Sequence, residues 1–483
     1  MRYSILVYLT RMSRTLLEAA EYLTVSSKED PMREELLANG QQMIDQIRAE
    51  LEHHRQDLRS SRPINCLNEV AQKWRGGEEC AASIRQFIQC LPQEVRYQVR
   101  AVFFAEQGEK WDSMETVYEF MRDDPRFDPV VVLTPVLRQV EDENGKVKRD
   151  IICKDYLTPM GIPFFECTKY SLEKDCPDLA FISQPYEDCS AQEFWPETIA
   201  QYTRLVYLPY FLAEAASINE VESLAQLPVY RHAWKVICPT EKQYDFYCKY
   251  SVCNGANALV TGLPKLDKLV NLKRDGIARP KGWDCLEGKT VFLWNSWYEA
   301  NVSSIRYFDE LMEWFKTHKD CALIWRPHPM TNAVTKLYHP DIYQSFLEKI
   351  QFAETLSNVV LDRETSYRAA FYYSDALISD PSSMILLYLL MDKPTLALTY
   401  KRRNPISNPL QKKPSVEFVD RRWRRWAYDT AEIFNFFEQI CMGVDENAEL
   451  RKEIRQQDLV LADGHSAERV CEALWTEMHR EDL

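Results

Sequence analysis

Short apolar runs alternate with amphipathic segments from residue 98 onward, and this alternation limits the possible folds more than any other feature. Six such runs precede residue 270: RAVFFAE, PVVVLTP, PDLAFIS, RLVYLPY, WKVICPT and ALVTGLP. Runs this short and this apolar are typical of buried parallel strands. The segments between them, such as SMETVYEFMRDD, have the periodicity of helices. Repeated strand–helix units predict a doubly wound α/β domain over residues 98–270.

The same pattern restarts after a polar stretch, NLKRDGIARPKGWDCLEGK, which we interpret as a linker. Five further runs follow it: TVFLWNS, CALIWRP, NVVLD, ALIS and PTLALT. They predict a second Rossmann-like domain over residues 285–430. Two such domains joined by a linker are expected to face each other across a cleft, where a ligand usually binds.

Helical periodicity marks both ends of the chain. In MIDQIRAELEHHRQDL and CAASIRQFIQCL apolar positions recur every three or four residues, so residues 1–97 are predicted to form three or four helices. We expect this region to serve packing or homo-oligomerisation, and contact of its first helix with a membrane surface is the alternative. Residues 431–483 are predicted to be helical as well.

Composition narrows the class of protein. Hydrophobic residues make up 46% of the chain and charged residues 27%, as in globular proteins. No run approaches the ~18 apolar residues of a membrane span, and three arginines interrupt the apolar start, unlike a signal peptide. Fourteen cysteines without a C-x-x-C pair fit reduced thiols in a cytoplasmic protein. The net charge of −14 argues against nucleic acid as a partner.

Several cofactor motifs are absent. The thirteen glycines include no G-x-G-x-x-G and no Walker loop, which disfavours a dinucleotide oxidoreductase or an ATPase. There is no D-x-D triplet and no cluster of cysteines and histidines with the spacing of metal ligands. We therefore expect neither a bound metal nor another cofactor.

The segment Ser379-Asp380-Pro381-Ser382-Ser383 is the strongest candidate site. It lies between the predicted strand ALIS and the predicted helix MILLYLLM. Proline suits a first helical turn, and Ser379 or Asp380 is suited to cap that helix. The amides and hydroxyls of Ser382 and Ser383 would then bind a phosphate at the helix N-terminus. An ordinary helix cap is the alternative, but the carboxyl end of a parallel strand favours a ligand site.

A second candidate, Arg326-Pro327-His328-Pro329, directly follows the predicted strand CALIW. Two prolines stiffen the backbone around one histidine, so its imidazole would leave the strand in a fixed direction. Histidine can donate to a phosphate or act as an acid or base near neutral pH, and the Arg326 guanidinium can pair with phosphate. A loop histidine bonded to a carbonyl is the alternative.

Two loops of the first domain are candidates for contact with an acceptor. The loop Glu106-Gln107-Gly108-Glu109-Lys110-Trp111 follows the first strand, so Glu106 and Lys110 are expected to face the cleft. Lys265 and Asp267, in TGLPKLD, are expected near the same cleft, although a structural hinge is the favoured role of that segment.

A basic segment stands out against the acidic average of the chain. It interleaves cations with indoles in Arg421-Arg422-Trp423-Arg424-Arg425-Trp426. This mixture suits an anionic membrane surface, where tryptophan lies at the headgroup level. A polyanionic acceptor would suit it equally, and a solvated helix face with its tryptophans packed inward is the alternative.

Three blocks of the sequence, TGLPKLDKL, WRPHP and ISDPSSMILLYLLMDKPTLAL, resemble those of the CDP-glycerol glycerophosphotransferases, the teichoic-acid primases and polymerases. The blocks have the order and spacing of that family over about residues 230–400, and the closing DGHSAERV is similar to its C-terminal helix. The resemblance implies a GT-B fold, a CDP-polyol donor and a lipid-linked or polymeric cell-surface acceptor. It also implies metal-independent transfer of glycerol phosphate, or of a related polyol phosphate, at the cytoplasmic face of the membrane.

Residue by residue, the resemblance implies a donor site around His328. This histidine would contact the donor pyrophosphate and assist the departure of CMP. Ser382 and Ser383 would bind the phosphates, and Arg326 and Asp380 would support that site.

The chain departs from the family at the acceptor base. Where the family has a Trp-His-Gly block, this sequence reads Tyr207-Leu208-Pro209-Tyr210-Phe211, and Glu106, Glu214 or a cleft loop is the candidate source of a base. Two alternative functions follow from the departures. One is a GT-B glycosyltransferase that uses a nucleotide sugar, and the other is a non-catalytic scaffold that binds nucleotide.

Overall fold

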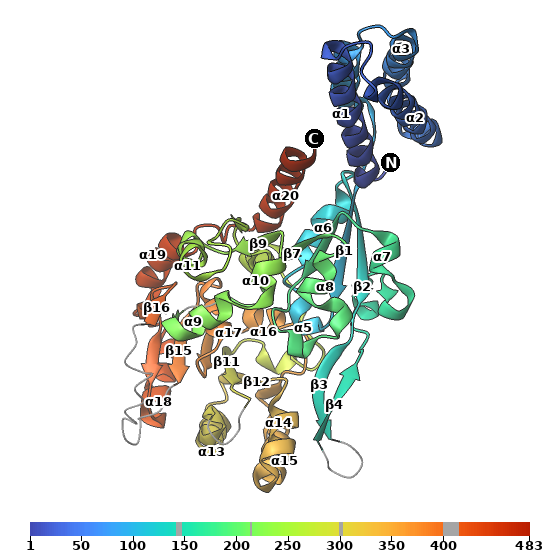
Figure 1. Cartoon of the computed structure of the whole chain (residues 1–483). Coiled ribbons are helices and arrows are strands. Elements are labelled where there is room, and N and C mark those ends of the chain that lie inside the picture. The colour runs from blue at the N-terminus through green and yellow to red at the C-terminus, as the bar shows by residue number, and fades with distance from the viewer. Residues whose placement is uncertain (142–146, 213–214, 299–302, 399–414) are drawn as a thin grey trace.

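The computed structural model describes residues 1–141, 147–212, 215–298, 303–398 and 415–483. Two parallel sheets with surrounding helices form the body of the molecule, and an N-terminal helical bundle projects from it (Figure 1). The N-terminus and the C-terminus lie on the same side of the body, where the bundle is attached.

Four helices form the bundle: α1 (Tyr3–Val25), α2 (Met32–His53), α3 (Arg62–Gly76) and α4 (Ala81–Glu94). Their apolar faces share one buried cluster, which includes Leu9, Ile44 and Trp74. A Cβ on Gly40 would lie 2.0 Å from Cζ2 of Trp74, which explains a glycine in the middle of α2. The prediction of a helical N-terminal region is confirmed.

The first sheet has seven parallel strands in the order β10-β9-β7-β6-β1-β2-β5. They are β1 (Val99–Ala105), β2 (Phe127–Leu133), β5 (Phe165–Glu166), β6 (Leu179–Ile182), β7 (Arg204–Tyr207), β9 (Lys235–Cys238) and β10 (Ala258–Val260). Phe103 of β1 packs into the core on one face, and Phe104 into the core on the other. Burial on both faces explains the uninterrupted apolar runs, and the six predicted strands are confirmed.

The second sheet has six parallel strands in the order β13-β12-β11-β14-β15-β17. They are β11 (Thr290–Ser296), β12 (Cys321–Pro327), β13 (Val359–Leu361), β14 (Ala376–Ser379), β15 (Thr395–Leu398) and β17 (Arg425–Ala427). Leu293 and Trp294 of β11 again enter opposite cores. The five predicted strands are confirmed, and β17 is an addition that its cationic sequence did not indicate.

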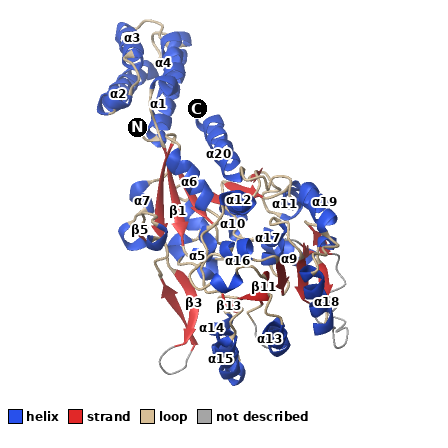
Figure 2. Cartoon of the chain, turned by 180° about the vertical axis from the view of Figure 1, so that it is seen from behind, coloured by secondary structure: helices blue, strands red, loops and turns tan. Residues whose placement is uncertain are grey.

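Helices cover both sheets (Figure 2). Around the first sheet lie α5 (Gly108–Trp111), α6 (Glu115–Asp123), α7 (Leu172–Asp175), α8 (Pro196–Ala200), α9 (Ile218–Ala225), α10 (Pro228–His232), α11 (Glu241–Tyr250) and α12 (Asp267–Asp275). Around the second lie α13 (Phe308–Thr317), α14 (Thr331–Tyr338), α15 (Pro340–Thr355), α16 (Arg368–Tyr373), α17 (Ser383–Leu389), α18 (Thr430–Cys441) and α19 (Ala448–Asp458). In each sheet the chain winds outward from its first strand in both directions, as predicted.

Three local features differ from the expectations. The expected linker begins as helix, because residues 271–275 complete α12. A hairpin of β3 (Val136–Glu141) and β4 (Val147–Ile152) extends from the first sheet, and its polar sequence gave no strand signal. An antiparallel pair, β8 (Ala215–Ser217) with β16 (Ser415–Glu417), connects segments about 200 residues apart, which local sequence patterns cannot indicate.

The last helix, α20 (Ser466–Asp482), returns to the first sheet. Its apolar face joins the core that contains Phe103. The Asp267 carboxylate accepts hydrogen bonds from the backbone N–H groups of Ser466 (3.0 Å) and Ala467 (2.8 Å), so it caps α20. Burial raises the pKa of Asp267. This residue therefore holds the end of the chain in place.

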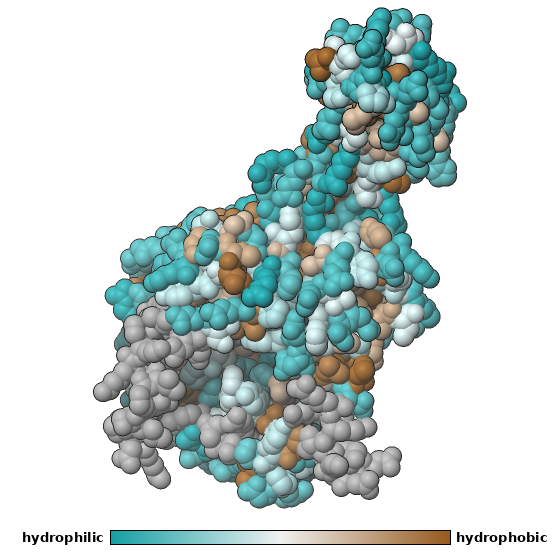
Figure 3. Space-filling model, in the orientation of Figure 1, coloured by the Kyte–Doolittle hydropathy of each residue, from teal (hydrophilic) through white to brown (hydrophobic). Residues whose placement is uncertain are grey.

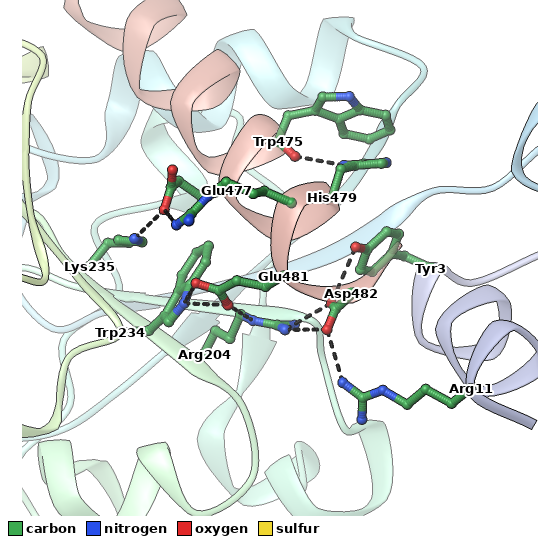
Figure 4. Close-up of polar contacts among 11 residues, drawn as sticks. Tyr3, Arg11, Arg204, Trp234, Lys235, Trp475, Glu477, His479, Glu481 and Asp482 are labelled. Atoms are coloured by element: carbon green, nitrogen blue, oxygen red, sulfur yellow. Dashed lines mark hydrogen bonds and ion pairs between the residues drawn. The ribbon is translucent and has the colours of Figure 1, made fainter. Parts of the chain in front are cut away.

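Asp482, the last residue of α20, joins three parts of the molecule (Figure 4). Its carboxylate accepts hydrogen bonds from Arg204 of β7 (2.8 Å to each oxygen) and from Arg11 of α1 (2.9 Å). The Tyr3 hydroxyl donates a fourth bond at 3.2 Å. The carboxylate side chain is 1% exposed, so these cations and the hydroxyl replace water around a buried charge.

We predict that Asp482→Ala lowers the free energy of unfolding by roughly 2–3 kcal/mol, because Arg204 and Tyr3 lose a buried partner. Urea denaturation measures this change. Arg480→Ala is the control, since that side chain is 66% exposed and should change stability by less than about 0.5 kcal/mol. Equal stability of the two variants would contradict a structural role for Asp482.

Candidate active site

Three neighbouring strands of the second sheet end where the sequence places its donor-site candidates. In the parallel register, Asn295 of β11 pairs with Arg326 of β12 on one side and with Ser379 of β14 on the other. The two predicted segments, 326–329 and 379–383, therefore flank the end of β11. The carboxyl edge of a parallel sheet is where such folds bind ligands.

Asn295 connects the two sides of this edge and was not predicted from the sequence. Its Nδ2 donates to Ser379 Oγ at 3.1 Å and to Ser382 Oγ at 3.4 Å. The asparagine is 6% exposed and Ser379 is fully buried. A lone asparagine at a strand end carries no distinctive signal, because its role depends on which strands become its neighbours.

The N-cap of the helix after β14 is Ser382, two residues after Asp380. Ser382 occupies the N-cap position of α17 and makes no side-chain capping bond, so the prediction that Ser379 or Asp380 caps this helix is wrong. The Ser379 hydroxyl instead donates to the backbone carbonyl of Asp380 at 2.7 Å. Ser383 is exposed and Ser382 is half-buried at the start of the helix.

Asp380 organises the chain that follows β11. Its carboxylate accepts hydrogen bonds from Trp297 N (2.7 Å), Ser304 N (3.0 Å) and Ser304 Oγ (2.7 Å). The aspartate is only 2% exposed. It therefore fixes the two ends of segment 297–304 beside the sheet edge, which fits the supporting role that the resemblance implied.

Arg326 is committed to a neighbouring loop. Its guanidinium forms an ion pair with Asp362 at 2.6 Å and donates to the carbonyls of Glu364 (2.9 Å) and Thr365 (3.1 Å). These bonds hold the loop 362–367 that follows β13. This commitment favours a supporting role for Arg326 over a direct contact with phosphate.

His328 lies half-buried beyond the end of β12, with its ring held from two sides. Its backbone N–H donates to the Ser296 carbonyl at 3.2 Å, and its Nδ1 accepts from Met330 N at 3.1 Å. The rings of Trp297 and Tyr298 lie 6.1 and 5.5 Å from the imidazole. Since Nδ1 accepts a hydrogen bond, the neutral ring carries its proton on Nε2, where it is a donor.

The acceptor-side loop meets the second sheet directly. A Cβ on Gly108 would lie 3.0 Å from Thr365 Cγ2, so the two loops touch with no room for a side chain. The buried Asp112 accepts hydrogen bonds from Lys265 Nζ (3.0 Å) and from the Tyr367 hydroxyl (2.9 Å). The two views in Figures 1 and 2 show α5 beside α16 at this junction. The carboxyl edges of the two sheets therefore face each other here.

The four acceptor-side candidates separate into two pairs. Lys265 is buried in its bond to Asp112, and Asp267 caps α20, so both side chains make structural contacts. Glu106 and Lys110 lie together after β1, with 3.9 Å between the carboxylate and the ammonium. Glu214 lies outside the described residues.

The basic segment is not one exposed patch, because two of its members are buried. Trp423 is fully buried in the core of the second sheet, and Arg424 is 4% exposed and lies over the Trp426 ring at 4.5 Å. Arg421 and Arg425 are half-buried, and Arg422 and Trp426 are exposed. The hypothesis of a six-residue surface is therefore corrected to one of four residues. Within the described ranges, no three metal-binding side chains form a cluster.

The family model described as CDP-glycerol:poly(glycerophosphate) glycerophosphotransferase matches residues 225–476. The matched region contains the whole second sheet, with His328 and Ser379–Ser383, and the last two strands of the first. No curated protein sequence matches the chain.

Solved structures share the fold at low sequence identity. A putative UDP-N-acetylglucosamine 2-epimerase from Listeria monocytogenes is 12% identical with a TM-score of 0.52, covering 79% of this chain and 97% of its own. A variant of the wall teichoic acid polymerase TagF is 9% identical with a TM-score of 0.50, covering 87% of this chain and 99% of its own. The predicted GT-B architecture of two facing Rossmann-like domains is thereby confirmed.

We predict that Asp380→Ala lowers the free energy of unfolding by about 3 kcal/mol, because two backbone N–H groups and one hydroxyl lose a charged acceptor. Urea denaturation measures the loss. Asp375→Ala is a matched control at the opposite end of β14, where the carboxylate accepts a bond from Val291 N at 2.8 Å. The control should lose about half as much, and a greater loss in the control would contradict the assignment.

Proposed function

The chain belongs to the CDP-glycerol:poly(glycerophosphate) glycerophosphotransferase family, and from this premise we propose how its two sheets divide the reaction. The protein is a transferase of glycerol phosphate, with CDP-glycerol as the donor and a cell-wall polymer as the acceptor. We propose that the donor binds at the ends of β11, β12 and β14, and that the acceptor approaches from the first sheet. The family match across both donor segments is the observation that carries this proposal.

In the proposed reaction, an acceptor hydroxyl attacks the β-phosphorus of CDP-glycerol. The bond from that phosphorus to the bridging oxygen breaks, and CMP leaves with this oxygen. His328 is the proposed catalytic group, because its Nε2–H donor can stabilise the charge that develops on the bridging oxygen. The Nδ1 bond to Met330 N supports this role by fixing both the tautomer and the direction of the ring.

The phosphates of the donor have a second proposed contact at the start of α17. Ser382 and Ser383 match the family's block at these positions, and Ser383 is exposed next to the sheet edge. Asn295 positions Ser382 through its 3.4 Å bond, and Asp380 and Arg326 hold the loops on either side. We therefore assign Ser379, Asp380 and Arg326 to support, and Ser382 and Ser383 to contact with the donor.

We also propose that the four accessible residues of the basic segment bring the protein to an anionic membrane. Arg421, Arg422, Arg425 and Trp426 lie close together in sequence at the edge strand β17, and Trp426 is 37% exposed. In the described part of the chain no helix is long and apolar enough to cross a bilayer. Hydrophilic residues predominate on the face drawn in Figure 3. Peripheral attachment at the cytoplasmic face would depend on the three arginines, which attract anionic headgroups, and on the Trp426 indole.

We predict that Arg421→Ser/Arg422→Ser/Arg425→Ser weakens binding to vesicles of phosphatidylglycerol on the order of 100-fold, because three charges are lost at about 1 kcal/mol each. Vesicle sedimentation at low salt measures the affinity. Arg363→Ser/Arg480→Ser is the control, because both side chains are more than 60% exposed and lie outside the segment. Undiminished sedimentation of the triple variant would refute the membrane proposal.

We predict that His328→Ala reduces the rate of CMP release from CDP-glycerol by about 10²- to 10⁴-fold, while the protein keeps its melting temperature within a few degrees. A short synthetic poly(glycerophosphate) serves as the acceptor, and chromatography quantifies CMP. His318→Ala is the matched control, because His318 precedes β12 at the opposite edge of the same sheet. The assignment of His328 fails if its variant releases CMP at more than a third of the normal rate.

A further inference from the structure

We propose that Glu106 is the general base that takes the proton from the attacking acceptor hydroxyl, and that Ser183 and Gln184 line the acceptor subsite beside it. This inference rests on the proposed function. It concerns the half of the reaction for which the sequence lacks the histidine expected at residues 207–211.

The position of Glu106 satisfies the first requirement of such a base. It follows Ala105, the last residue of β1, at the carboxyl edge of the first sheet. Its loop touches Thr365 through Gly108, and the Thr365 carbonyl is held by Arg326 of β12. His328 follows the end of β12 directly, so one chain of contacts connects the proposed base to the proposed catalytic histidine.

The surroundings of Glu106 include a cation and an aromatic ring. Its carboxylate is 8% exposed, and the Lys110 ammonium lies 3.9 Å away. The same ammonium lies 4.9 Å from the centre of the Tyr210 ring, so Lys110 lies between the Glu106 carboxylate and this ring. An acceptor that ends in glycerol phosphate brings a hydroxyl for the carboxylate and a negative phosphate for the ammonium.

Two buried polar side chains next to Glu106 have no hydrogen-bond partner among the described residues. They are Ser183, through Oγ, and Gln184, through Oε1, which are 1% and 6% exposed. Both follow β6, which pairs with β1 at Phe103 and Phe181, so they come alongside Ala105 and Glu106. Buried polar groups are nearly always paired, so these two oxygens at the strand end beside Glu106 fit a subsite for a polar ligand. A polyol supplies hydroxyl groups that would satisfy a hydroxyl oxygen and an amide oxygen.

The other titratable groups around Glu106 are poorer bases. Burial raises the pKa of the Tyr210 phenol and of the Cys189 thiol, so both stay protonated at neutral pH. Burial also raises the pKa of Tyr186. Asp188 is an exposed carboxylate next in sequence to Cys189, whose thiol lies 3.7 Å from it. Among these neighbours, Glu106 is the carboxylate that lies directly at a strand end.

The proposed step balances as follows. The acceptor O–H bond breaks, its proton moves to the Glu106 carboxylate, and the oxygen forms a bond to the β-phosphorus of the donor. The phosphorus–oxygen bond to CMP breaks at the same time, and no oxidant, reductant or metal is consumed. Glu106 then returns its proton to water.

The test compares Glu106→Gln and Glu106→Asp with the control Asp188→Asn. Calorimetry measures binding of CDP-glycerol and, separately, of a synthetic trimer of glycerol phosphate. Chromatography measures CMP release with both substrates across a range of pH. We expect Glu106→Gln to bind both ligands within threefold of the unaltered protein, to release CMP at least 100-fold more slowly, and to lose the acid limb of the pH profile. Glu106→Asp should recover part of the rate, and Asp188→Asn should match the unaltered protein.

Ser183→Ala/Gln184→Leu adds an independent readout of the subsite. This double variant should weaken binding of the trimer about tenfold and leave binding of CDP-glycerol unchanged. The inference is overturned if Glu106→Gln keeps more than a third of the CMP release, or if the unaltered protein does not bind the trimer. If the unaltered protein binds the trimer but neither binds nor cleaves CDP-glycerol, the proposed function itself has failed.

Discussion

The buried carboxylate of Asp112 connects the two sheet domains and fixes their relative position. It accepts one hydrogen bond from Lys265, near the end of the first sheet unit, and another from Tyr367, which leads into α16 of the second. One turn further on, Glu115 pairs with Arg368 and with Lys268. A buried ion pair contributes less to stability than to a unique arrangement, because each charge tolerates only a partner in the right place. Here these ion pairs bring the carboxyl edges of the first and second sheets together.

This constraint gives the loop after β13 its importance. The Thr365 carbonyl accepts a hydrogen bond from Arg326, and the Thr365 side chain contacts Gly108, so the carboxyl edges of the two sheets meet at this loop. Chemistry between two bound substrates needs their reacting atoms placed within a fraction of an ångström. In the division of the reaction proposed above, Arg326, Asp380 and Asn295 serve this need by holding the loops and Ser382 in place. Because Arg326 and Asp380 are buried, their charges have to be neutralised or hydrogen-bonded by protein groups, and neither side chain is available to a ligand.

The sequence predicted the two sheets because buried parallel strands are continuously apolar, and strands with other compositions were missed. The strand β17 reads Arg425-Trp426-Ala427, and Trp423 before it is buried although its neighbours are cationic. Strand-end reasoning located His328 and Ser379–Ser383. It could not assign Arg326 to Asp362 or Asp267 to the N-terminus of α20, because those pairs are 36 and about 200 residues apart. Contacts at such separations are fixed by tertiary packing and leave no local pattern.

The position of the acceptor base likewise depends on which strands are neighbours in the sheet. Residues 207–211, where a family histidine is expected, contain none, and Tyr207 at the start of this block is completely buried with its ring packed edge-on against Tyr230 at 5.5 Å. Burial raises the pKa of the Tyr207 phenol well above its ordinary value, so Tyr207 can neither reach a substrate nor accept a proton. A transfer reaction at this edge therefore requires a base on an adjacent strand. The strand β6 lies next to β7 and ends in Ser183 and Gln184, and β1 follows with Glu106. Moving the base by two strands keeps it at the same edge of the sheet and facing the same donor, so the loss of the histidine does not by itself remove the chemistry.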